Sequence, residues 1–188
     1  MKRQPLFALL LGLVMAFPVA AADYKLDDAH TFIEFRIQHL GFSWLYGRFN
    51  TLKGNFSYDE AKPEASKVKV VINTASIDTN HAERDKHLRS KDFFAVDKYP
   101  EATFVSTGYT PMGKDKGRLE GNLTLRGVTK PVTIEVTQVG AGDDPWGGYR
   151  RGFYGTTAIT LADFGIPYDL GPAARTAELM LTAEGIRE

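Results

Sequence analysis

Hydrophobic and polar residues alternate along most of the chain, which is the pattern of half-buried β-strands. Residues 31–39 show it clearly, with Ile33, Phe35 and Ile37 in one phase and polar residues in the other. The same alternation recurs at 67–73, 118–126, 130–139, 149–161 and 176–186, and shorter runs lie at 46–50, 54–58 and 102–109. The sequence therefore predicts about eight or nine strands in an all-β domain.

Turn-forming residues separate these strands, and 113–117 and 126–131 are predicted to be hairpin loops. Antiparallel strands that each carry one apolar face close most economically as a barrel or a sandwich. No shift in composition, internal repeat or low-complexity tract marks a second domain. The pattern therefore favours one domain built from a single closed or layered sheet.

One densely charged segment interrupts the strands and is predicted to be a helix near residues 80–91. Asn80 is expected to cap it, with Glu83 three residues on as in a capping box. Two pairs four residues apart are expected to interact along its surface, Glu83 with His87 and Asp85 with Arg89. So short and polar a helix is marginal alone, and we expect it to pack on the sheet.

The N-terminus has the features of a secretory signal peptide. Lys2 and Arg3 precede an apolar run at 6–19, and small residues follow at 20–22. An uncleaved membrane anchor is disfavoured because the apolar run is too short to span comfortably. We expect cleavage after Ala22, a periplasmic location, and a mature domain of residues 23–188.

Charge and cysteine content exclude several classes of function. The chain has no Cys, so it forms no disulfide and has no thiol nucleophile. Residues 1–22 carry two basic and no acidic residues, so their removal changes the formal net charge from 0 to −2. This balance gives neither the basic footprint of a nucleic-acid-binding protein nor a polybasic membrane signal.

No catalytic or metal-binding motif stands out. The four His do not form an HExxH pattern, and no Gly-x-Ser-x-Gly elbow or glycine-rich phosphate loop is present. Asp143 and Asp144 begin a segment that could hold Ca²⁺, but its Asp, Pro and Gly residues favour a turn. We therefore expect no catalytic residues, no metal site and no cofactor.

One group of aromatic residues has two possible structural roles. Phe42, Trp44 and Tyr46 share one phase of a strand, where they either fill the core or line a ligand cavity. A barrel of about eight strands permits both, because its interior is filled by side chains or holds one small ligand. Trp146, in the turn at 142–148, is a candidate for contact with lipid or ligand.

Several motifs in order resemble the YceI-like family of periplasmic proteins, and its enterobacterial-type branch in particular. The most specific is NHAERDKHLRS at 80–90, followed by DF at 92–93 and YP at 99–100. The others are DYKLD at 23–27, FRIQHLG at 35–41, SWLYG at 43–47, GNLTL at 121–125, GVTKPVT at 127–133, GDDPWGG at 142–148 and DLGPA at 169–173.

This resemblance implies an extended eight-stranded antiparallel lipocalin-like β-barrel that binds a polyisoprenoid lipid, of prenyl or quinone type, for periplasmic transport or storage. It also implies transient contact with the membrane or with membrane-bound quinone enzymes. We expect the barrel interior to be lined by Phe35, Ile37, Phe42, Trp44, Val70, Ile72, Leu123, Ile134 and Phe153. Head-group or entry residues are expected to be Arg84, Arg89 and Trp146, with Arg84 the better candidate to face a ligand oxygen.

Two other functions remain open at this point. One is a stress-induced scavenger that sequesters assorted lipophilic compounds. The other, less favoured, is a periplasmic hydrolase whose Ser, His and Asp are brought together by folding. The molecules that co-purify with the protein would distinguish these functions. Dedicated carriage predicts one prenyl species, scavenging predicts a mixture, and a hydrolase predicts no bound lipid.

Overall fold

The computed structural model describes residues 21–188, so the predicted signal peptide lies almost entirely outside the described residues. The strands are β1 (Ala22–Leu26), β2 (Phe32–His39), β3 (Ser43–Phe49), β4 (Leu52–Tyr58), β5 (Lys67–Asn73), β6 (Ile77–Asp78), β7 (Glu101–Pro111), β8 (Lys116–Leu125), β9 (Val128–Asp143), β10 (Tyr149–Thr160) and β11 (Thr176–Arg187). The helix α1 covers Ala82–Arg89, and four short 3₁₀ helices, η1 to η4, cover Pro63–Ala65, Thr74–Ser76, Leu161–Phe164 and Pro172–Ala174.

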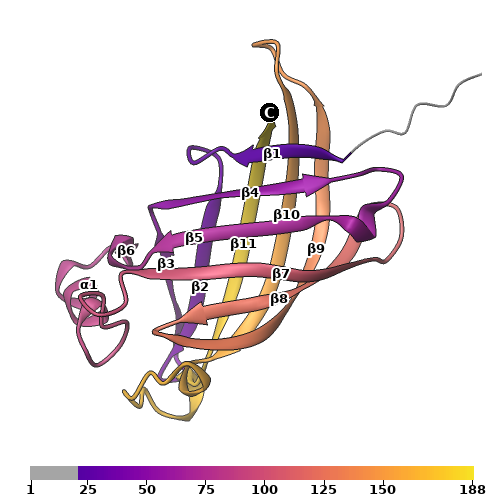
Figure 1. Cartoon of the computed structure of the whole chain (residues 1–188). Helices are drawn as coiled ribbons and strands as arrows, with labels where there is room; N and C mark the ends of the chain where they lie inside the picture. Colours follow the sequence, from indigo (N-terminus) through magenta and orange to yellow (C-terminus); the bar gives the residue numbers. More distant parts are fainter. Residues whose placement is uncertain (1–20) are drawn as a thin grey trace, which may run out of the picture.

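Eight of the strands close into an antiparallel barrel, in the order β1-β4-β5-β7-β8-β9-β10-β11 and back to β1. The closing contact joins β11 to β1 through the pairs of Tyr24 with Arg187 and Leu26 with Gly185. Figure 1 shows β4, β5, β7 and β8 crossing in front of β9, β10 and β11, so the barrel is flattened into two crossing layers. This architecture confirms the predicted all-β, eight-stranded barrel.

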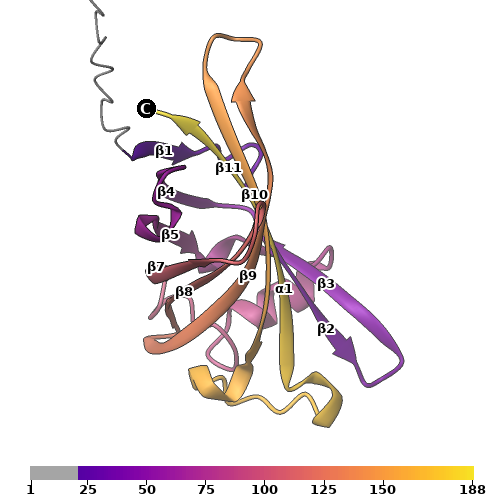
Figure 2. The ribbon, with the colours of Figure 1, turned by 90° about the vertical axis from the view of Figure 1, so that its right-hand side faces the viewer.

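The remaining strands form a ribbon that leaves the barrel. β11 pairs with β2 over residues 178–182, β2 pairs with β3, and β3 pairs with the two-residue strand β6. Figure 2 shows the β2–β3 hairpin projecting away from β4, β5 and β7. The alternation pattern had indicated neither β1 nor β6, and β6 with two residues is too short to give a periodic signal.

The main core lies inside the barrel, where apolar side chains from opposite layers meet. The Tyr24 and Phe56 rings are stacked with centroids 4.7 Å apart, and Tyr24 is 1% exposed. Gly185 lies directly beneath them, and a Cβ atom there would collide with the Phe56 ring. This position therefore requires glycine so that β11 can approach β1 and β4 closely.

Helix α1 is confirmed but differs from its prediction at both ends. It begins after His81, whose Nδ1 accepts the Arg84 N–H at 3.2 Å, so His81 rather than Asn80 is the cap. Asn80 has φ of +60° and donates its own N–H to Asp78. Among residues 21–188, no helix is both long and apolar enough to cross a membrane.

Candidate ligand-binding cavity

An apolar cavity lies between the two layers of the barrel. All eight barrel strands and β2 contribute to its lining, which consists mainly of Val, Leu, Ile and Phe side chains. The centre of a water-sized sphere can occupy about 170 Å³ of it. One water needs only roughly 10–15 Å³ on this measure. The cavity is therefore far larger than a single-water packing defect, and its lining suits an apolar ligand.

The structure brings five of the nine predicted interior residues to this cavity. They come from four strands and occupy the inward phase that alternation had indicated: Val70, Ile72, Leu123, Ile134 and Phe153. Ile134 and Ile72 are also buried. Their contact with a ligand remains a prediction, because the geometry establishes only that they face the barrel interior.

The other four predicted residues, Phe35, Ile37, Phe42 and Trp44, do not line the cavity. Phe42 is 87% exposed, and Trp44 stacks against the Arg36 guanidinium with 4.3 Å between Arg36 Cζ and the ring centroid. Phe35 packs against Phe49, and Ile37 is buried elsewhere. Two of them lie on β2, Trp44 lies on β3, and Phe42 lies in the turn between these strands. This hairpin turns out of the barrel, so its apolar phase does not follow the barrel interior.

The predicted head-group arginines on α1 are bound to the chain itself. Arg84 donates to Thr79 Oγ1 at 2.7 Å and to the Thr79 carbonyl at 2.5 Å. Arg89 donates to the carbonyls of Ala75 and Ile77. Neither side chain borders the cavity. Both guanidiniums instead fasten the helix to the segment around β6.

The two side-chain pairs predicted within α1 do not form. Asp85 is buried and accepts hydrogen bonds from the Thr79 N–H and hydroxyl at 2.9 and 2.5 Å, rather than from Arg89. His87 pairs with Asp92, not with Glu83, and its ring packs edge-on against Phe93. The helix therefore directs its polar groups toward neighbouring loops, a choice that residue spacing within the helix could not predict.

Trp146 lies at the tip of the β9–β10 hairpin and is 78% exposed. Asp144 holds the turn, because its Oδ1 accepts the N–H groups of Trp146 and Gly148. Its Oδ2 accepts Arg150 Nε at 2.9 Å, and the Arg150 guanidinium lies 5.3 Å from the Trp146 ring centroid. This carboxylate therefore acts in a turn, as the sequence favoured, and Trp146 is outside the cavity lining.

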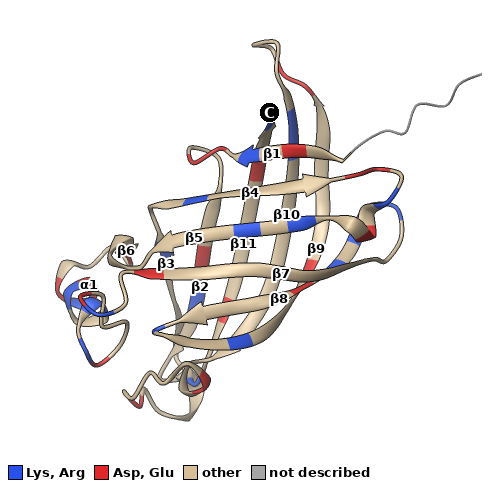
Figure 3. Ribbon diagram, in the orientation of Figure 1, with Lys and Arg blue, Asp and Glu red and all other residues tan. Residues whose placement is uncertain are grey.

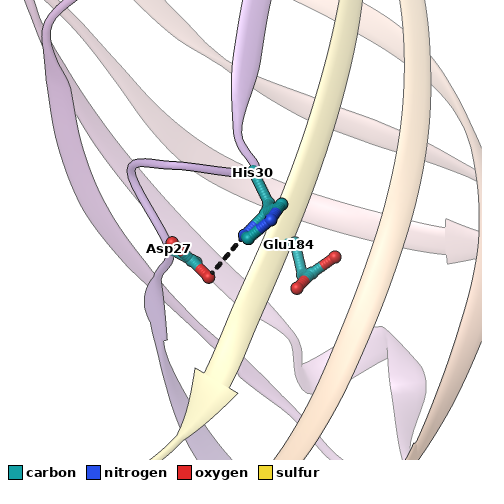
Figure 4. A group of neighbouring side chains, drawn as sticks. All are labelled: Asp27, His30 and Glu184. Carbon is teal, nitrogen blue, oxygen red and sulfur yellow. Dashed lines mark hydrogen bonds and ion pairs between the residues drawn. The ribbon is translucent and has the colours of Figure 1, made fainter.

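Three potential ligand groups for a metal meet on the outside of the barrel. Figure 4 shows Asp27, His30 and Glu184, whose ligand atoms lie within 4.8 Å of one another. Arg150 Nη1 donates to Asp27 at 2.6 Å and to Glu184 at 2.5 Å. The guanidinium thus already pairs with both carboxylates. Arg150, followed by His30, lowers the pKa of Asp27 from 3.8 to about 2.

A polar group at one end of the interior was missed by the sequence analysis. Arg151 is only 3% exposed, and its guanidinium lies 4.3 Å from the Tyr58 ring centroid. It donates to Gln138 Oε1 at 2.6 Å and to the Glu60 carboxylate, and Tyr24 OH lies 3.4 Å from its Nε. Figure 3 shows where basic and acidic residues lie along β10 and the loop after β4.

Hydrogen bonds keep the buried Arg151 guanidinium charged. Burial by itself lowers the pKa of Arg151, but the hydrogen bonds that it donates to Tyr24 and Glu60 outweigh this effect, so that the pKa lies above its ordinary value. Burial also raises the pKa of Tyr58. One signal could have identified Arg151: it shares the phase of Phe153 on a predicted strand, so a charged residue occupies an inward position.

Comparison with known proteins agrees with this architecture. Residues 24–184 match the YceI-like domain. A UPF0312 protein of Pseudomonas aeruginosa is 59% identical over 192 residues, covering 100% of both chains. A UPF0312 protein of Yersinia enterocolitica is 54% identical and covers 100% of this chain and 99% of its own.

Solved structures share the fold. The Campylobacter jejuni YCEI protein has a TM-score of 0.74 and 29% identity, with 81% of this chain and 90% of that chain covered. Burkholderia cenocepacia BcnA has a TM-score of 0.76 at 24% identity, over 85% and 98% of the two chains. The family match spans nearly the whole barrel, and the chain belongs to the YceI-like family.

Proposed function

We propose that this protein binds a polyisoprenoid lipid, of prenyl or quinone type, in the barrel cavity and carries or stores it in the periplasm. The observation that carries the proposal is the cavity itself, which apolar side chains from both layers enclose. Burial of an apolar chain is favourable by roughly 0.8 kcal/mol for each CH₂ removed from water. The interior offers such burial with few polar groups to desolvate.

The relatives support the choice of ligand class. A structure from Saccharophagus degradans, described as a polyisoprenoid binding domain, has a TM-score of 0.65 and 18% identity over 88% of this chain and 98% of its own. At that identity only the fold is shared, and binding of the same lipid class by this chain is our proposal. We propose a binding role rather than catalysis, with loading from a membrane or from a membrane-bound quinone enzyme.

Native mass spectrometry of protein purified from periplasmic extract tests this function. A single prenyl mass would support dedicated carriage, and a mixture of lipophilic masses would support scavenging instead. An empty protein that hydrolyses an ester or peptide would contradict both binding functions. Mild desalting into volatile buffer keeps a non-covalent apolar ligand bound during the measurement.

Two valine variants make the test specific to the cavity. Val132 lines the cavity on β9, and Val139, on the same strand, is 72% exposed. Val132→Phe fills part of the space and should lower lipid occupancy. Val139→Phe adds the same atoms on the outside and should leave occupancy unchanged. Equal occupancy in both variants would place the lipid elsewhere.

A further inference from the structure

The inward phase of three strands changes from apolar to polar at one end of the cavity. Along β10 the inward residues are Phe153 and then Arg151, and along β9 they are Val136 and then Gln138. On β4 the last inward residue is Tyr58, which both lines the cavity and stacks on Arg151. The guanidinium therefore lies directly behind Tyr58, just beyond the residues that line this end of the cavity.

The opposite part of the interior is closed by packed side chains. Leu125, Ile159 and Phe164 are buried in the same core cluster as Leu26 and Ile72 but do not line the cavity. An apolar chain in the cavity would therefore have its polar end beside Tyr58, with the Arg151 guanidinium as the nearest charged group behind that ring. Among residues 21–188, Arg151 is the only buried basic side chain.

Two features distinguish this group from an ordinary buried ion pair. Glu60, the carboxylate that neutralises Arg151, is 70% exposed, so it can turn into solvent without breaking the core. Ser66, which also lines the cavity, has a buried hydroxyl oxygen with no hydrogen-bond partner. A buried polar atom without a partner is rare in native proteins, and this hydroxyl can take a hydrogen bond from a bound water or a ligand.

We propose that Arg151, with Gln138 and Tyr58, is the recognition site for an anionic head group, a carboxylate or phosphate, at the end of the bound apolar chain. This inference rests on the proposed lipid-binding function. The ligand's anionic oxygens replace the Glu60 carboxylate on the guanidinium. A guanidinium binds such oxygens through paired, charge-assisted hydrogen bonds. The exchange keeps the buried positive charge compensated, whereas an alcohol head group would leave Glu60 in place.

Three C15 prenyl probes with different ends test the proposal: farnesol, farnesoic acid and farnesyl phosphate. The mature protein is first freed of co-purified lipid, as checked by native mass spectrometry, and each probe is titrated by calorimetry. Farnesoic acid, farnesyl phosphate or both should bind at least about tenfold more tightly than farnesol, the scale of one hydrogen bond to a charged group. Which anion binds more tightly distinguishes the carboxylate from the phosphate head group.

Variants of Glu60 and Arg151 give opposite expected results. Glu60→Ala removes the carboxylate that competes with the ligand for Arg151. It should raise the affinity for the anionic probes severalfold and leave the affinity for farnesol unchanged. The matched control is Glu64→Ala, an exposed acid in η1 of the same loop, which should behave as the wild type. Arg151→Gln should lower the affinity for the anionic probes to that for farnesol, and farnesol itself should still bind.

The outcomes separate this inference from the proposed function. If farnesol binds the wild type as tightly as both anions, the head-group site is refuted and lipid binding stands. If no probe binds, prenyl binding and the head-group site both fail. If Arg151→Gln does not fold, the Glu60→Ala variant tests the proposal by itself. Anionic probes that bind Glu60→Ala no more tightly than the wild type would refute the replacement of Glu60 by the ligand.

Discussion

Arg150 Nη1 lies 2.6 Å from Asp27 Oδ2, and this contact fastens β10 to the loop that follows β1. The same guanidinium also pairs with Glu184 and Asp144. Its neighbour on the strand, Arg151, points inward. Two consecutive arginines of β10 therefore serve different faces: one closes the outer seam of the barrel, and the other faces the interior.

The first prediction concerns acid stability. Because the pKa of Asp27 falls to about 2 in the folded protein, from 3.8, the unfolded chain binds the proton more readily. The stabilisation is therefore fully present above about pH 4 and is lost as the pH falls from about 4 to 2. In melts between pH 2 and 5, Asp27→Asn should show a smaller decline in melting temperature than the wild type.

Asp28 provides the control for this experiment. It is the exposed neighbour of Asp27 in the same loop, outside the Arg150 ion pairs. Asp28→Asn should follow the wild-type pH dependence. Parallel curves for the wild type and Asp27→Asn would show that the Arg150 contact does not couple to protonation.

The second prediction concerns the arginines of α1. Arg84→Ala removes two hydrogen bonds to Thr79 and should lower the free energy of unfolding by about 1–3 kcal/mol, since charged groups donate both. Lys86→Ala, at an exposed position of the same helix, should change it by at most about 0.5 kcal/mol. Chemical denaturation measures both. Lipid occupancy that falls in Arg84→Ala without loss of stability would restore the head-group role that the sequence suggested.

The third prediction concerns the inward phase of β5. Val70→Asp places an unpaired carboxylate in the apolar cavity and should strongly reduce co-purified lipid, because an isolated charge there is costly to bury. Val71→Asp, on the opposite face of the same strand, is the matched control and should retain lipid. Native mass spectra give the occupancy, and circular dichroism confirms folding. Full occupancy in folded Val70→Asp would exclude this face from the binding site.

The fourth prediction concerns the mature N-terminus. Cleavage after Ala22 would leave Asp23 as the first residue, which keeps most of β1, including the buried Tyr24. The intact mass of the protein from periplasmic extract should therefore correspond to residues 23–188. A species in the inner membrane that retains Met1 would contradict export with cleavage.

The sequence by itself determined most of the strands, and the choice of a barrel over a sandwich came from the resemblance to the YceI-like family. Alternation along β5, β8 and β9 placed Val70, Leu123 and Ile134 in an inward phase, and the structure confirms that orientation. This success has a local cause, since a strand buried on one face must alternate regardless of its partners. The family motifs likewise depend only on residue order, and the match over residues 24–184 confirms them.

Only the tertiary structure decided which apolar faces share one space. Phe42 and Trp44 alternate as regularly as Val70 and Ile72, yet their hairpin leaves the barrel, because β2 pairs with β11 and not with β4. Alternation distinguishes the two faces of a strand but carries no information about what lies opposite either face. Long-range pairing supplies that information.

The tertiary structure also decided which groups the charged side chains contact. Arg84 is bound by Thr79 at the edge of β6, and Arg151 by Tyr58, Gln138 and Glu60 from two other parts of the barrel. Spacing along one helix or strand limits which neighbours within that element can meet. A hydrogen bond between residues 91 positions apart, such as Arg151 with Glu60, exists only because barrel closure brings their strands together.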